Sequence, residues 1–76
     1  MNERNILIRF LDDCLNYAKR CSQPEKFFYQ AFGAVGLYTA TAYANGNAEE
    51  ESAAAALWNY EYRAKFEEVV YGKVSE

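Results

Sequence analysis

Hydrophobic positions divide the chain into three segments with helical spacing. In the first, residues 2–21, apolar side chains recur at intervals of three and four while charged side chains fill the opposite side. These apolar positions are Leu7, Phe10, Leu11, Cys14, Ala18 and Cys21. The pattern predicts an amphipathic helix over residues 2–21.

The second segment is apolar on nearly every side, because residues 27–44 contain no charged side chain. Ser22 and Glu25 have the spacing of a capping box, Pro24 suits a first helical turn, and Asn45-Gly46 suits a terminator. These signals predict a central helix over residues 24–45. Its expected core positions are Phe28, Ala31, Phe32, Val35, Tyr38, Thr39 and Ala42.

The third segment begins with a second capping signal, in which Asn47 is the cap and Glu50 reaches back to it. A run of alanines and a further apolar stripe follow, and Gly72 marks the end. We expect a helix over residues 48–71. Short connections force neighbouring helices to be antiparallel, so residues 1–76 are predicted to form a single all-α domain, an antiparallel three-helix bundle.

Two flanking helices cannot cover all of the central one. An uncovered line remains at intervals of four and three: Tyr29, Gly33, Gly36, Ala40 and Tyr43. Glycine inside a helix costs roughly 1 kcal/mol relative to alanine, which suggests a compensating close contact. That contact is either internal, with Trp58 or a Phe received against the glycines, or intermolecular. We expect a homo-oligomer with an isologous interface, with a foreign protein as the other possible occupant.

Composition and charge narrow the class of protein. Half of the residues are hydrophobic and 17% are aromatic, which excludes a disordered tail, and the net charge of −3 argues against direct nucleic-acid binding. Polar residues and glycines within 27–44 argue against a membrane span. Cys14 and Cys21 lie roughly 10 Å apart along one helix, too far to bridge. They are expected to be reduced thiols in a cytoplasmic protein.

Catalytic chemistry is missing from the sequence. There is no histidine, which removes the usual general base and the commonest metal ligand. Both cysteines fall on an apolar stripe, as core residues do. We therefore expect no enzyme, no cofactor and no metal site.

Two charged features are candidate binding sites. A basic corner at the second helix start could hold a nucleotide-like anion, using free backbone N–H groups; it comprises Tyr17, Lys19, Arg20, Lys26 and Tyr29. An acidic face on the third helix could occupy a basic groove of a partner in place of nucleic acid; it comprises Glu49, Glu50, Glu51, Glu61, Glu67 and Glu68. Solvated turns and surfaces are the simpler interpretation of both.

In size and composition the chain is similar to small accessory proteins of phages and mobile elements, although this resemblance covers no motif and assigns no residue. From the acidic face we expect a non-enzymatic protein of this kind, which binds and inhibits a host nucleic-acid-handling machine. The alternatives are an oligomeric protein that sequesters a small anion at the basic corner, and a self-associating structural subunit.

Overall fold

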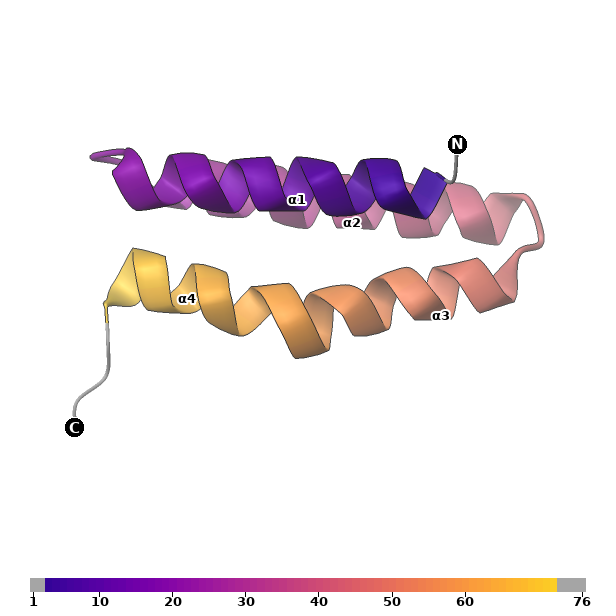
Figure 1. The fold of residues 1–76 in the computed structure, drawn as a ribbon. Helices are drawn as coiled ribbons and strands as arrows, with labels where there is room; N and C mark the ends of the chain where they lie inside the picture. Colours follow the sequence, from indigo (N-terminus) through magenta and orange to yellow (C-terminus); the bar gives the residue numbers. More distant parts are fainter. Residues whose placement is uncertain (1–2, 73–76) are drawn as a thin grey trace.

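The computed structural model describes residues 3–72, which form three helical rods joined by two short turns (Figure 1). The first rod is α1, Glu3–Arg20, and the second is α2, Glu25–Ala44. The third consists of α3, Ala48–Leu57, a π-helical turn η1, Trp58–Tyr62, and α4, Arg63–Tyr71. No strand occurs among the described residues, and the predicted all-α fold with three helices is confirmed.

The rods form an elongated bundle of 41 × 24 × 17 Å. α1 runs along the bundle, α2 returns beside it, and the third rod runs back along both (Figure 1). Each rod contacts the other two, because α4 packs on α1 as well as on α2. The cross-section is therefore triangular, and each helix turns one side inward.

Three of the predicted helix boundaries are confirmed by their local geometry. Asn47 Oδ1 accepts the Glu50 backbone N–H at 3.1 Å and so caps α3. Gly46 and Gly72 follow α2 and α4 with φ of +73° and +78°, the left-handed region in which only glycine is unstrained.

The predicted capping box at Ser22 is wrong. α2 begins at Glu25, with Pro24 in the cap position and no side-chain cap. The backbone closes the first turn instead, because Gln23 and Pro24 carbonyls accept N–H groups from residues 26–28 at 3.0–3.2 Å. The connecting turn is held differently as well, since the Gln23 N–H donates to Cys21 Sγ at 3.3 Å.

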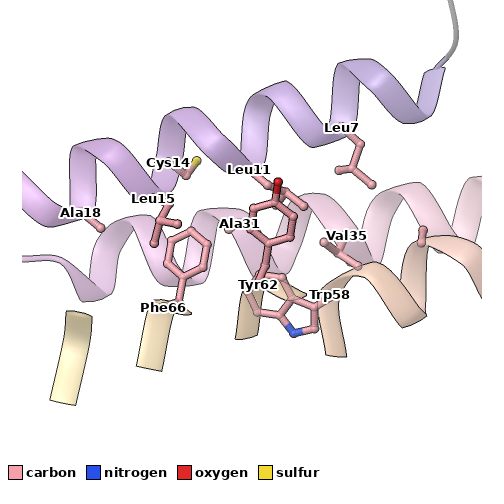
Figure 2. Packing of buried hydrophobic residues seen from close by; sticks show 11 residues of the cluster. Leu7, Leu11, Cys14, Leu15, Ala18, Ala31, Val35, Trp58, Tyr62 and Phe66 are labelled. Atoms are coloured by element: carbon pink, nitrogen blue, oxygen red, sulfur yellow. The ribbon is translucent and has the colours of Figure 1, made fainter. Parts of the chain in front are cut away.

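The core lies on the axis of the triangle (Figure 2). α1 supplies five buried side chains: Leu7, Leu11, Cys14, Leu15 and Ala18. The third rod supplies Ala54, Trp58, Tyr62 and Phe66, and α2 supplies only Ala31, Val35 and Ala42. Phe66 and Leu11 are the largest side chains that are completely covered. The helix with the most apolar sequence therefore contributes the fewest fully buried side chains.

The π-helical turn aligns the buried residues of the third rod. These residues are spaced by four, and in a regular α-helix each step of four overshoots a full turn by about 40°. In η1 the Arg63 N–H donates to the carbonyl of Trp58, five residues earlier, which unwinds the helix locally. Tyr62 and Phe66 thereby stay on the same inward line as Trp58 (Figure 2).

One predicted core position of α2 is wrong. Ala31, Val35 and Ala42 are buried, and the remaining predicted positions are half-buried except for Phe32, which is 60% exposed. Phe32 contacts Trp58 with 5.8 Å between ring centroids, but it lies at the margin of the interface.

Two leucines provide a matched test of this packing. Leu11→Ala should lower the free energy of unfolding by about 2–5 kcal/mol, because Leu11 is fully covered and the substitution leaves a cavity. Leu37→Ala, on the exposed side of α2, should change it by no more than about 0.5 kcal/mol at a protein concentration low enough to keep the chain unassociated. Urea denaturation followed by circular dichroism measures both, and equal losses would contradict the packing.

Candidate interaction surface

The outward side of α2 is a continuous uncharged surface. We call it the outer face of α2, and it consists of Tyr29, Phe32, Gly33, Gly36, Leu37, Ala40 and Tyr43, all of which are exposed. Its four large side chains are 60–72% exposed. Isolated apolar residues are common on protein surfaces, but a contiguous apolar patch usually marks an interaction site. The five residues predicted as an uncovered line all lie on this face.

The glycines of this face have no internal partner. A Cβ atom placed on Gly33 or Gly36 would meet nothing from the neighbouring helices within 4 Å. The alternative in which they receive Trp58 or a Phe is therefore wrong. Trp58 instead contacts α2 at the margin of the outer face, 5.8 Å from Phe32 between ring centroids, and stacks on Phe28 at a centroid distance of 6.0 Å. An intermolecular contact remains as the hypothesis for these glycines.

A groove between α1 and α2 adjoins the outer face. Its volume is about 480 Å³, and Ile6 and Phe10 of α1 face Leu37 and Thr41 of α2 across it. Sequence reasoning missed this feature, because Phe10 was predicted to be on the buried stripe and is 41% exposed. Helical spacing identifies one side of α1 but does not say where the neighbouring helix stops covering it.

Glu50 joins all three rods at one end of the bundle. Its carboxylate accepts two hydrogen bonds from the Arg4 guanidinium, both 2.8 Å, and one from the Tyr38 hydroxyl at 2.7 Å. The bonds from Arg4 and then Tyr38 lower the pKa of Glu50 to about 2. Burial first, and then the carboxylate, raise the pKa of Tyr38 to about 12. The prediction that Glu50 reaches back to Asn47 is wrong, since its side chain points across the bundle instead.

The six glutamates predicted as an acidic face are in different environments. Glu50 is held by Arg4 and Tyr38, Glu67 pairs with Arg63 at 3.1 Å, and Glu51 is half-buried. Glu49, Glu61 and Glu68 are exposed. Two of the six carboxylates are thus already paired within the chain, so the surface is less acidic than the sequence suggests.

The basic corner is also partly occupied by contacts within the chain. The Arg20 guanidinium lies 5.2 Å above the Tyr17 ring, and Phe27 stacks on the same ring at 5.7 Å. Tyr29 stacks on Phe28. The predicted free N–H groups are wrong for residues 26–28, because these N–H groups donate to backbone carbonyls. Lys19 and Lys26 are exposed.

Other polar groups of the core also serve the fold. The Tyr62 hydroxyl donates to Asp12 Oδ1 at 2.5 Å and points toward α1 (Figure 2), and burial followed by this bond raises the Tyr62 pKa. Cys14 is buried, which raises the pKa of its thiol and disfavours the reactive thiolate. Within residues 3–72, no three metal-ligating side chains converge, and no helix is long and apolar enough to cross a membrane.

Comparisons of the chain with protein-family models, with curated proteins and with solved structures found no match. The outer face of α2 and the adjoining groove are therefore interpreted from their own geometry.

The Glu50 cluster predicts a specific acid dependence of stability. Because folding lowers the pKa of Glu50 from 4.5 to about 2, its contribution is complete above about pH 4.5 and is lost as the pH falls toward 2. Wild-type protein should therefore lose more stability than Glu50→Gln between pH 5 and pH 2 in thermal melts. The exposed neighbour variant Glu49→Gln should follow the wild-type curve, and identical slopes in all three proteins would refute the role of Glu50.

The glycines of the outer face predict an unusual gain in stability. Gly33→Ala and Gly36→Ala should each raise the free energy of unfolding by about 0.5–1 kcal/mol, because alanine favours helix and its Cβ has room. Gly46→Ala is the contrasting variant and should lower stability, since φ at that position is +73°. Chemical denaturation at low protein concentration measures the unassociated chain. A loss at Gly33 or Gly36 would contradict the open geometry.

Proposed function

We propose that this protein works by binding another protein chain, without chemistry of its own, and that the outer face of α2 is its docking surface. The observation that supports this function is the exposure of Tyr29, Phe32, Leu37 and Tyr43 on a helix that carries no charge between residues 27 and 44. A helix that serves only as a scaffold ordinarily places charged residues on its solvent side.

The composition of the face fits a protein partner. Tyrosine combines a large apolar body with a polar tip, which is why it is enriched in interfaces and in their energetic hot spots. The line Tyr29, Gly33, Gly36, Ala40, Tyr43 has the alternating spacing of four and three that a partner helix can follow. Small residues at the centre let two backbones approach closely, and no charge has to be desolvated when they do.

The two charged features support a function less well. Inhibition of a nucleic-acid-handling machine by the acidic surface would depend on Glu49, Glu61 and Glu68, because Glu50 and Glu67 are paired within the chain. Sequestration of an anion would require the basic corner to release the Tyr17 ring from Arg20 and Phe27. A reducing compartment such as the cytoplasm fits Cys14 and Cys21, both of which are free thiols.

Photo-crosslinking in the cells of origin tests the proposed docking surface. A photoreactive phenylalanine in place of Leu37 or Tyr43 should give a discrete covalent protein adduct, because both side chains lie within the surface. The same group in place of Tyr60, which is 85% exposed on the third rod, is the matched control and should give little adduct.

The absence of a specific adduct would refute this function. If Leu37 and Tyr43 yield no adduct, or only the diffuse products also seen from Tyr60, the outer face of α2 does not dock a protein. Mass spectrometry of the adduct identifies the bound polypeptide and separates a second copy of this chain from a foreign protein.

A further inference from the structure

We infer that the partner on the outer face of α2 is a second copy of this chain, packed antiparallel about a two-fold axis that passes close to Gly36. This inference rests on the proposed function, because it specifies the occupant of the same surface. It is carried by two features of the described residues: the symmetry of the outer face, and the distribution of charge between the two ends of the bundle.

The outer face is self-complementary in the antiparallel direction. With the axis at Gly36, residues equally far before and after it lie opposite each other, as an isologous interface requires. Tyr29 and Tyr43 are both seven residues from Gly36, so each Tyr29 lies opposite Tyr43 of the second copy. Gly33, Gly36 and Ala40 form the centre, where the two backbones can approach. Phe32, four residues before the axis, lies opposite Ala40 of the second copy, and the tyrosines enclose the contact at both ends.

The two ends of the bundle carry opposite charge. Around the turn between α1 and α2 there are three basic residues and one acidic residue, Lys19, Arg20, Lys26 and Glu25, for a net charge of +2. At the opposite end, where α1 begins and α3 follows α2 (Figure 1), there are four acidic residues and one basic residue, for a net charge of −3. This acidic group consists of Glu3, Glu49, Glu50 and Glu51, with Arg4 as the single cation. α4 ends near the turn between α1 and α2 (Figure 1), and it carries two basic and two acidic residues. It therefore leaves the net charge of +2 at that end unchanged.

These charges select the antiparallel direction. Packing about Gly36 brings Lys26 of one copy level with residue 46 of the other, close in sequence to Glu49. Basic and acidic ends then meet twice in the dimer. A parallel pair would instead place the two acidic ends together and the two basic ends together, which costs energy at both. A foreign partner would have to supply both an uncharged helix and matching ends, whereas a second copy has them already.

Disulfide trapping of purified protein tests the direction. In a Cys21→Ser background, an equimolar mixture of Tyr29→Cys and Tyr43→Cys chains should form a covalent dimer on mild oxidation. Neither chain alone should do so, because in the antiparallel pair two copies of residue 29 are separated by fourteen residues of helix, roughly 21 Å. Gly36→Cys alone should crosslink, since it lies at the axis. The background chain, with only the buried Cys14, is the control.

Charge reversal tests the electrostatic argument independently. By sedimentation equilibrium, Lys26→Glu and Glu49→Lys should each weaken dimerisation by about 2- to 5-fold at low salt. The double variant should restore it, because the exchanged charges again meet opposite partners. Gly36→Leu should shift the protein to monomer while keeping its helical circular dichroism and a cooperative thermal transition, a combination that a merely unfolded variant cannot show.

Three results would overturn the inference: a wild-type chain that stays monomeric at about 1 mM, crosslinking of Tyr29→Cys with itself, or failure of the mixed chains to crosslink. Its failure is distinguishable from that of the proposed function. If self-association is absent but Leu37 and Tyr43 capture a discrete foreign polypeptide in cells, the docking surface stands and only the occupant is wrong. If neither occurs, both proposals are refuted.

Discussion

Triangular packing of three rods is the constraint on which the rest of this structure depends. When each rod contacts both of the others, every helix can bury only its inward side. α1 and the third rod satisfy this condition in the usual way, with apolar residues inward and charged residues outward. α2 has no charged residue to place outward between positions 27 and 44, so its outer side is apolar and exposed.

The same constraint explains the polar contacts of the bundle. A carboxylate at the junction of three rods is costly unless its oxygens are satisfied, and Glu50 satisfies them with Arg4 and Tyr38. Tyr62 is bonded to Asp12 for the same reason, since a buried hydroxyl needs a partner. Both carboxylates therefore stabilise the packing, and fewer remain available to a partner.

The outer face of α2 could supply by association the apolar burial that the small core lacks. A chain of 76 residues has little apolar surface to bury alone, and small domains frequently gain stability from association. In this chain the whole outer face of α2 is apolar, although a polar surface would serve a monomer. Gly33 and Gly36 also lower the helix propensity of α2 at positions that no neighbouring helix approaches. The glycines cost stability in an isolated chain, the exposed apolar side contributes none there, and both are favourable in a complex, which is the physical basis for the proposed interaction.

Local sequence signals were enough to predict the three helices and the uncovered apolar side of α2. Apolar spacing, Asn47, Gly46 and Gly72 predicted three helices and most of their ends, because these signals are local and depend on backbone geometry. The line from Tyr29 to Tyr43 was also predicted to be uncovered, because two neighbouring helices cannot surround a third. Three features could be seen only once the helices were packed: Gly33 and Gly36 have no internal partner, Phe32 and Phe10 are exposed, and Glu50 crosses the bundle to Arg4. Those outcomes depend on how the rods are rotated about their axes, which is set by contacts between distant residues such as Phe28, Trp58 and Phe66.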